Sequence, residues 1–526
     1  MSGLARANTG TVIGVEAHSV TVEAHRAKGL PGLTLIGLAR GAVRESVVRV
    51  RSAILASGLS LGTQRSVVNL LPAELPKEAS ALDLPLAIAL LAASGLLDIQ
   101  ALDGRRFFGE LSLGGRLEPV RGGVLLADLV RRRGERELIV PTQNATEAAV
   151  IPGVQVTGAE SLADVIAHLD GSSPIPPTEH QEGQMRREHP CLSDVRGQSR
   201  AKRALEIAAA GGHNILMLGP PGSGKTMLAR RLAGLLPHLA CDERIEVTRI
   251  HSAAGEYRDQ ELHSERPFRA PHHSASEVAL CGGGTTPRPG EVTLAHRGVL
   301  FLDELPEYSR RALEALREPL EDGSIRVARA AMSVEFPAEV LLVAAMNPCP
   351  CGYYRGDLPN HEPNPGTNPC LCSFESIQRY RSKISGPLLD RIDLHVCVDA
   401  VAYRDFSSGR RGEGTELIRS RVERARATQR TRLGPAGTNA TMGQRDIERT
   451  VHLTDDLLTM IEVAISEYGL STRAVARCLK VARTIADLAG VERVSAKHLR
   501  EALGLRLLGR TGLPRKAYGR NRTGAV

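Results

Sequence analysis

One segment of this chain restricts its possible folds more than any other: a short apolar run, a glycine-rich loop and an amphipathic helical pattern in direct succession. Residues 214–234 are NILMLGPPGSGKTMLARRLAG, with an apolar run at 215–218 and Gly-x-x-x-x-Gly-Lys-Thr immediately after it. This order of strand, loop and helix is the context that a phosphate-binding P-loop requires. It predicts a parallel α/β sheet with the loop at the carboxyl end of a strand.

The residues of this loop suit a nucleoside triphosphate and Mg²⁺. Glycine lets backbone N–H groups turn inward around phosphate oxygens, and the start of the following helix adds positive partial charge. We expect Lys225 to reach the terminal phosphates and Thr226 to bind Mg²⁺. The predicted nucleotide-binding residues are Gly219, Pro220, Pro221, Gly222, Ser223, Gly224, Lys225 and Thr226.

A second motif supplies two carboxylates. Residues 298–307, GVLFLDELPE, contain an unbroken apolar run that ends in Asp303 and Glu304. Such runs are typical of buried parallel strands, whose carboxyl ends carry ligand-binding groups. We expect Asp303 to hold Mg²⁺ through water and Glu304 to orient and deprotonate the attacking water. The alternative is a pair of solvated carboxylates at a strand end, which the preceding P-loop disfavours.

Three further polar residues are candidates for sensing or stabilising the terminal phosphate. Asn347 follows the apolar run VLLVAAM, where a polar side chain can help to place the attacking water. Arg391 in GPLLDRIDLHV and Arg473 in STRAVARCL can supply positive charge, also from a neighbouring subunit. Surface salt bridges are the alternative role for both arginines.

Residues 347–373, NPCPCGYYRGDLPNHEPNPGTNPCLCS, hold four of the nine cysteines in two Cys-x-Cys pairs. The stretch between the pairs is rich in Pro, Gly and Asn and has no core of its own. A long loop inside a compact domain needs another source of order, and thiolate–metal bonds supply one. The predicted Zn²⁺ ligands are Cys349, Cys351, Cys370 and Cys372, with His361 as a substitute. Four reduced thiols in a flexible loop are the alternative, because Cys-x-Cys is shorter than the usual zinc spacing.

The composition, with 42% hydrophobic and 24% charged residues, is that of a soluble globular protein. Because the chain has no long apolar run and no apolar leader, we expect no membrane insertion and a cytoplasmic location, where thiols stay reduced. The net charge of +8 permits a polyanionic partner without requiring one. Aromatic residues make up only 3%, which disfavours an aromatic platform for stacking bases.

The distribution of strand-like and helical patterns predicts a multidomain α/β protein. Residues 1–170 mix β-type and helical runs, and residues 171–190 have the Pro, Ser and charge content of a linker. Residues 191–400 alternate strands and helices as in a parallel α/β domain, and residues 401–510 are helical. Residues 511–526 form a basic tail.

Several long segments resemble AAA+ ATPases of the magnesium-chelatase-like branch. They are residues 194–232, which include the P-loop, 268–307, which include the two carboxylates, and 385–396, SGPLLDRIDLHV. The resemblance is closer to the ComM (YifB) group. It includes GLPGLTLIGLARGAVRESVVRVRSAILASG at 29–58 and STRAVARCLKVARTIADL at 471–488, so it extends over nearly the whole chain.

This resemblance implies a fold and an activity. Residues 1–170 then adopt a Lon-protease-like, ribosomal-S5-type α/β fold, followed by an AAA+ domain with a parallel sheet and a C-terminal helical lid. ComM-like proteins form hexameric rings and act as ATP-dependent DNA helicases that drive branch migration during natural transformation. The implied site residues are Gly219 to Thr226 as Walker A, Asp303 and Glu304 as Walker B, Asn347 as sensor 1, Arg391 as arginine finger and Arg473 as sensor 2.

Lon-type peptidases use a Ser–Lys dyad, and this chain departs from that pattern. In PKEASALDLP, residues 76–85, the position of the serine falls on Ala81, with Ser80 one residue early. In RGGVLL the position of the lysine falls on Val124 or Leu125. A serine without a basic neighbour is a weak nucleophile, so we expect the fold without the peptidase chemistry.

Several residues are candidates for contacts with DNA. Tyr353, Tyr354 and Arg355 directly follow the first cysteine pair, on what we expect to be a rigid base. Arg326 and Arg329 lie in a predicted β-hairpin, where they would contact phosphates without sequence preference.

The adjacent histidines His272 and His273 lie between the two nucleotide motifs. Neighbouring side chains point in different directions, so we expect a structural or DNA-facing role rather than a metal pair.

Two other functions remain open at this level. A magnesium-chelatase motor subunit would act on a metal-inserting protein complex, and a protein-remodelling ATPase would use the N-terminal domain as a docking adaptor. ATP hydrolysis that DNA stimulates separates the DNA motor from both.

Overall fold

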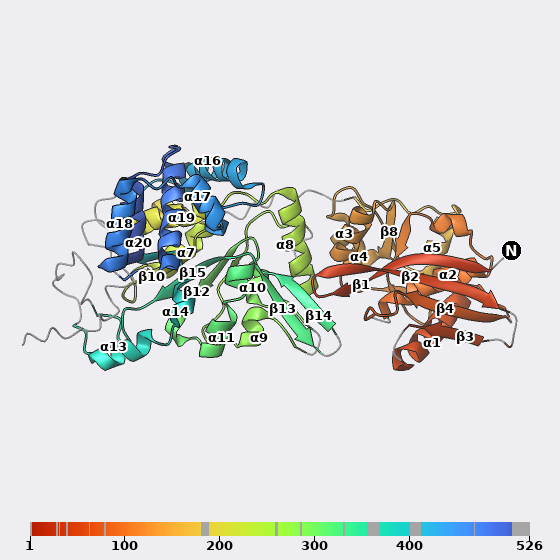
Figure 1. Cartoon of the computed structure of the whole chain (residues 1–526). Helices are drawn as coiled ribbons and strands as arrows, with labels where there is room; N and C mark the ends of the chain where they lie inside the picture. Colours follow the sequence, from red (N-terminus) through yellow and green to blue (C-terminus); the bar gives the residue numbers. More distant parts are fainter. Residues whose placement is uncertain are drawn as a thin grey trace, which may run out of the picture.

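The chain is a multidomain α/β protein with two separate sheets and a C-terminal set of helices (Figure 1). The computed structural model describes residues 3–27, 30, 32–37, 40–62, 64–77, 80–179, 189–257, 261–284, 287–329, 332–354, 369–399, 412–467 and 469–507. In Figure 1 the N-terminal sheet, in red and orange, lies at one end, and the blue C-terminal helices lie at the other. Within those ranges, no helix combines the length and the apolar character needed to cross a bilayer.

Seven strands form the mixed N-terminal sheet, in the order β3-β4-β2-β1-β5-β8-β9. β1 and β2 pair antiparallel, while β5 and β8 continue the sheet in parallel. The strands are β1 (Leu4–Ile13), β2 (Glu16–Ala27), β3 (Gly32–Ile36), β4 (Arg65–Leu71), β5 (Arg105–Phe107), β8 (Glu137–Pro141) and β9 (Gln155–Ala159), beside a small pair β6 (Glu110–Leu111) and β7 (Leu117–Glu118).

Helices cover both faces of this sheet, because its inner strands are apolar on both sides. The alternation along β8 shows the division: Ile139 shares a core with α1, α2 and α5, whereas Leu138 and Val140 share one with α3 and α4. The helices are α1 (Arg40–Ala56), α2 (Asp83–Ala93), α3 (Gly123–Arg133), α4 (Thr142–Ala149) and α5 (Leu162–Leu169).

The second sheet has five parallel strands in the order β11-β12-β15-β10-β16. The predicted strands at 215–218 and 299–302 are confirmed, and the latter is buried throughout. The strands are β10 (Ile215–Leu218), β11 (Phe268–Arg269), β12 (Val299–Leu302), β15 (Leu341–Met346) and β16 (Leu394–Cys397).

The two faces of this sheet carry different layers. One face shares a core with α6, α7 and the C-terminal helices, and the other packs on short helices and the hairpin β13–β14. The first layer comprises α6 (Ser199–Gly211), α7 (Lys225–Leu232), α16 (Thr415–Leu433), α17 (Gln444–Thr450), α18 (Asp455–Ser466), α19 (Thr472–Leu488) and α20 (Ala496–Leu507). The second comprises α9 (Glu277–Cys281), α10 (Glu291–Leu294), α11 (Arg310–Ala315), β13 (Ser324–Arg329) and β14 (Met332–Pro337), with α12 (Pro319–Asp322), α13 (Phe374–Arg381) and α14 (Gly386–Leu389) nearby.

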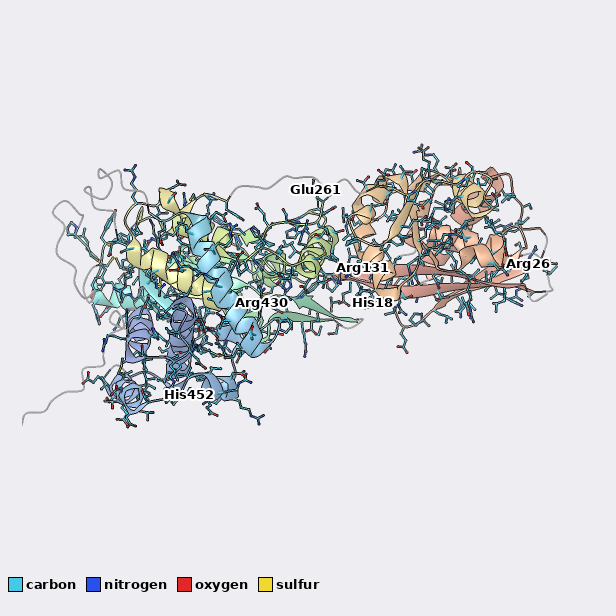
Figure 2. All side chains as sticks on the ribbon, turned by 90° about the horizontal axis from the view of Figure 1, so that it is seen from above. His18, Arg26, Arg131, Glu261, Arg430 and His452 are labelled. Carbon is cyan, nitrogen blue, oxygen red and sulfur yellow. The ribbon has the colours of Figure 1, made fainter. Side chains whose placement is uncertain are left out.

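A charged seam joins the N-terminal domain to α8 (Cys241–Ala254), which stands between the two sheets in Figure 1. Asp128 of α3 is only 1% exposed, and its carboxylate lies 3.2 Å from the Arg249 guanidinium of α8. Arg131, labelled at this boundary in Figure 2, adds a longer contact of 3.5 Å to Asp242. Ile245 of α8 also shares a core with α3, so the seam combines charge pairing with apolar burial.

The turn between β1 and β2 forms a second contact across the domains, with the hairpin β13–β14. A Cβ built on Gly14 would lie 2.4 Å from Val334 Cγ1, and Gly14 has a φ of +63°. Glycine is therefore needed there both for backbone conformation and for close approach. Val15 shares a core with Val334 and Phe336, so the N-terminal domain covers one side of the hairpin.

Replacing Arg249 by Met should loosen the seam, because buried Asp128 then loses its cross-domain partner. Asp128 keeps Arg131 and Arg132 of its own helix, so we expect a loss of about 1–2 kcal/mol of docking energy rather than full dissociation. Amide hydrogen exchange should accelerate in α3 and α8 and not in β10 or β15. Arg133→Met on the exposed end of α3 is the matched control; unchanged exchange in the Arg249 variant would contradict the assigned role of the pair.

Candidate nucleotide site and cysteine cluster

The carboxyl ends of three neighbouring strands meet at one edge of the second sheet. β10, β15 and β12 are adjacent and parallel, with Leu218 opposite Met346 and Leu302 opposite Ala344. The segments that follow these three strands carry the predicted residues Lys225, Asn347 and Asp303. The sheet therefore brings all three to the same edge.

The glycines of the loop after β10 are needed by its geometry. A Cβ built on Gly219 would lie 2.2 Å from the carbonyl oxygen of Val398, so only glycine allows the loop to pass the end of β16. Gly222 and Gly224 have φ values of +75° and +90°, a region that L side chains rarely adopt. α7 begins directly afterwards at Lys225, which gives the loop the helix start that favours an anion.

Lys225 is buried and its ammonium group has three acceptors. Its Nζ donates to the carbonyl oxygens of Gly219 (2.8 Å) and Pro220 (2.9 Å) and to Asn347 Oδ1 (3.2 Å). Burial lowers the pKa of Lys225, and the charges of Asp303 and Glu304 partly offset that effect. The structure therefore brings the predicted lysine, the predicted sensor and both carboxylates into one site.

Thr226 and Asp303, the two residues predicted to hold Mg²⁺, lie beside each other. Thr226 Oγ1 donates to Asp303 Oδ2 at 2.8 Å. The contact brings the predicted Mg²⁺ ligand next to the carboxylate expected to hold the ion through water.

Glu304 has a partner that sequence reasoning missed. Its carboxylate lies 3.3 Å from His273 Nδ1, and its backbone φ of +51° is unusual for a residue with a side chain. The structure adds a specific contact to the expected structural or DNA-facing role of His273: its side chain faces the predicted general base. Because β11 is only two residues long, no sequence pattern indicates that the segment after it lies beside β12.

Arg391 lies away from Lys225, and its charge and that of Arg473 act on the same carboxylate, Glu321. Arg391 precedes β16, and its carbonyl oxygen accepts from Asn214 Nδ2 at 3.2 Å, just before β10. Arg391 is therefore at the amino edge of the sheet, opposite the P-loop. Its guanidinium pairs with Glu321, whose pKa is lowered mainly by Arg391 and to a smaller extent by Arg473.

The four predicted cysteines form a compact group. The Sγ of Cys349 lies 3.3 Å from that of Cys351 and 3.7 Å from that of Cys370, and all four sulfurs lie within 4.8 Å of one another. Tetrahedral Zn²⁺ with Zn–S bonds of about 2.3 Å places its sulfurs about 3.8 Å apart, whereas a disulfide requires about 2.05 Å. The donor set and the spacing therefore fit a zinc ion.

The surroundings of the cluster alter the predicted DNA contacts. The backbone N–H of Tyr354 donates to Cys349 Sγ at 3.2 Å, and the Arg381 guanidinium lies 5.3 Å from the centre of the Tyr354 ring. Tyr354 thus has a structural partner inside the protein. Arg355 and His361 lie outside the described residues, as does the side chain of Arg329.

Three family models match the chain. They are magnesium chelatase subunit ChlI over residues 191–406, subunit ChlI of Mg-chelatase over 22–144, and the ChlI C-terminal model over 412–506.

Curated relatives are similar over nearly the full length. Competence protein ComM of Haemophilus influenzae is 44% identical over 502 residues, which is 94% of this chain and 96% of the relative. The chain belongs to the ComM/YifB family of magnesium-chelatase-like AAA+ proteins. YifB of Salmonella typhimurium is 42% identical over 96% of this chain and 98% of its own, and the magnesium-chelatase 38 kDa subunit of Cereibacter sphaeroides is 28% identical over 30% of this chain and 52% of its own.

Membership of the ComM/YifB family implies ATPase activity with ATP and Mg²⁺.

In the N-terminal domain of this family member, the positions that correspond to a Lon-type dyad are apolar. Ala81 is buried, and so are Val124 and Leu125. Lys77 instead donates to the backbone carbonyl of Leu75 at 3.0 Å.

Replacing His273 by Ala should raise the basal rate of ATP turnover. The contact with His273 holds the Glu304 carboxylate, and its removal frees that group to approach the attacking water. We expect kcat to rise about twofold to fivefold with little change in nucleotide affinity, a pattern that separates turnover from binding. His452→Ala, which removes an exposed histidine between α17 and α18, is the control; a fall in kcat for His273→Ala would show that the histidine positions Glu304 productively.

Proposed function

We propose that this chain is one subunit of an ATP-driven homo-hexameric ring that moves on branched or single-stranded DNA in the cytoplasm. The observation that carries the proposal is the separation of Lys225 and Arg391 to opposite edges of one sheet. The same chain then supplies a nucleotide site on one side and a phosphate-binding arginine on the other.

In this proposal, ATP is the substrate and the residues of one edge prepare its hydrolysis. Lys225 exchanges its carbonyl partners for the terminal phosphates, while Thr226 and Asp303 hold Mg²⁺. Glu304 accepts a proton from the attacking water, and Asn347 helps to place that water. The bound Mg²⁺ neutralises charge on the phosphate oxygens.

The arginines act on the nucleotide of a neighbouring copy. The four-residue parallel strands β10 and β16 span about 13 Å from edge to edge, at about 3.3 Å per residue. Arg391 lies beyond one edge and the P-loop beyond the other, so a second copy has to supply the arginine. Arg473, whose charge also acts on Glu321, is the second arginine of this proposal.

Mixing two inactive variants tests this arrangement. Lys225→Ala retains Arg391, and Arg391→Ala retains the nucleotide site, so each alone should lose ATP hydrolysis by about 10³-fold or more. In a random equal mixture, about a quarter of the sites pair an intact P-loop with an intact Arg391, so about a quarter of wild-type activity should return. Arg379→Ala, an exposed arginine on α13, is the control; a mixture no more active than its components would contradict action between copies.

Support for a DNA partner comes from charge and from the relatives. The net charge is +8, and Arg326 on the hairpin β13–β14 is 72% exposed with only an exposed partner, Glu335, at 3.4 Å. A relative of nearly full length is named a competence protein. We therefore propose a ComM-like helicase that promotes branch migration during recombination in natural transformation.

A second candidate function is a magnesium-chelatase motor subunit. The family models and the Cereibacter sphaeroides relative favour it, although that relative matches only 30% of this chain. A protein-remodelling ATPase is a further alternative, since the N-terminal domain offers a docking module.

DNA should stimulate ATP hydrolysis and the protein should displace strands from a Holliday junction. Lys225→Ala should abolish both activities, because the motion depends on phosphate binding.

Arg326→Ala should weaken DNA binding without changing sequence preference. It should also reduce the slope of the log of DNA affinity against the log of salt concentration by about one. Arg133→Ala is the control for Arg326→Ala. An ATP hydrolysis rate that does not change when DNA is added would contradict the proposal. Metal insertion into a tetrapyrrole in the presence of partner subunits would support the magnesium-chelatase alternative.

We also propose that Cys349, Cys351, Cys370 and Cys372 hold Zn²⁺. The sulfur spacing and the all-thiolate donor set support this metal. The ion would cross-link two segments that are far apart in sequence and have little apolar core of their own.

A further inference from the structure

We propose that the cysteine cluster and the nucleotide site are coupled, so that metal in the cluster and nucleotide in the loop at 219–226 bind with positive cooperativity. This inference rests on the proposed zinc and ATP sites. It adds that each strengthens the other through contacts between residues 347–354 and the P-loop.

The first connection is covalent. Asn347, whose Oδ1 accepts from Lys225 Nζ at 3.2 Å, is two residues before the buried cluster member Cys349. Pro348 lies between them, and its ring restricts the backbone. Fixing the sulfur of Cys349 therefore limits where the Asn347 side chain can lie.

The second connection is a packing contact between two loops. A Cβ built on Gly352 would lie 2.4 Å from Pro221 Cδ, so the backbone after the first cysteine pair lies directly against the proline of the P-loop. Gly352 has a φ of +87°, which again requires glycine. A shift of the cysteine segment therefore cannot occur without moving Pro221 or opening this contact.

Helix α13 supports the same segment from the other side. Arg381 donates from Nε to the carbonyl oxygen of Pro348 at 3.0 Å, and its guanidinium lies against the Tyr354 ring. The residues that lead into α13 bury little, since Leu371 is 89% exposed and Phe374 is 55% exposed. The cysteines therefore add to the apolar contact that ties α13 to the end of β15, where Tyr380 shares a core with Met346.

Reciprocal linkage follows from this arrangement. Metal binding favours the geometry in which Asn347 and Pro221 face the nucleotide, and nucleotide binding favours the geometry in which the cysteines meet. Any change that metal makes in nucleotide affinity must appear as an equal change in metal affinity. We expect a factor of about ten, within the usual range of coupling.

The experiment uses full-length protein and reads binding rather than turnover. Zinc transfer to the chelator 4-(2-pyridylazo)resorcinol is followed with and without a non-hydrolysable ATP analogue and Mg²⁺. The affinity for a fluorescent ATP analogue is then compared between zinc-loaded and zinc-stripped protein. At equilibrium with the chelator, we expect nucleotide to raise zinc affinity about tenfold and stripping to weaken nucleotide binding about tenfold. Nucleotide should also slow zinc transfer.

Variants locate the coupling. Cys370→Ser should lower zinc content and nucleotide affinity together, whereas Cys241→Ser, an exposed cysteine on α8, should change neither. Pro221→Ala should keep its zinc and lose most of the effect of nucleotide on zinc transfer, because it removes the ring that contacts Gly352. If stripped protein unfolds, the transfer measurement on loaded protein still decides the question.

The outcomes separate the proposals. Protein that binds no zinc overturns the metal site and the coupling together, and protein that binds no nucleotide overturns the ATPase and the coupling together. The coupling alone is overturned if zinc and nucleotide both bind, but zinc transfer does not depend on nucleotide and nucleotide affinity does not depend on zinc.

Discussion

The parallel register of β12, β15 and β10 is the constraint on which the nucleotide site depends. β15 is buried along its whole length: Val343 and Ala345 face the core shared with the C-terminal helices, and Leu342 and Ala344 face the opposite core. A slip of one residue would exchange these faces, so packing on both sides fixes the register. That register sets the relative positions of the carboxyl ends of the strands and brings Lys225 within hydrogen-bond distance of Asn347.

Sequence patterns predicted the parts of the site that carry their own local signal. The strands at 215–218 and 299–302 and the hairpin β13–β14 are where the patterns placed them, because the first two are unbroken apolar runs and the hairpin strands alternate apolar and polar residues. The contacts of His273 with Glu304 and of Gly352 with Pro221 join segments far apart in the chain. No local pattern encodes such contacts, and the two-residue strand β11 is too short to reveal its neighbour.

The N-terminal domain contacts the rest of the chain through two surfaces and has apolar residues at the positions expected for a peptidase dyad. The buried positions Ala81 and Val124 offer no nucleophile or base, and the buried carboxylate of Asp83 is paired with Arg49 at 2.6 Å. Burial raises the pKa of Asp83, and Arg49 opposes that shift. The helical face formed by α3 and α4 packs on α8, while the β1–β2 turn covers one side of the hairpin β13–β14. The domain is therefore positioned to restrain the hairpin proposed to contact DNA.

The setting of Arg391 suits a residue that acts on another copy. Its backbone is fixed, because its carbonyl oxygen accepts from Asn214 and from Arg477, and the adjacent Asp393 is buried against His213 at 3.1 Å. Its side chain is only 13% exposed and donates to the carbonyl oxygen of Pro387 at 2.9 Å, whereas its charged partner Glu321 is 62% exposed. In the proposed ring, a neighbouring phosphate would compete with that exposed carboxylate for the guanidinium. If the proposed ring forms, the fixed backbone of Arg391 would let assembly, rather than refolding of the chain, complete the proposed catalytic site.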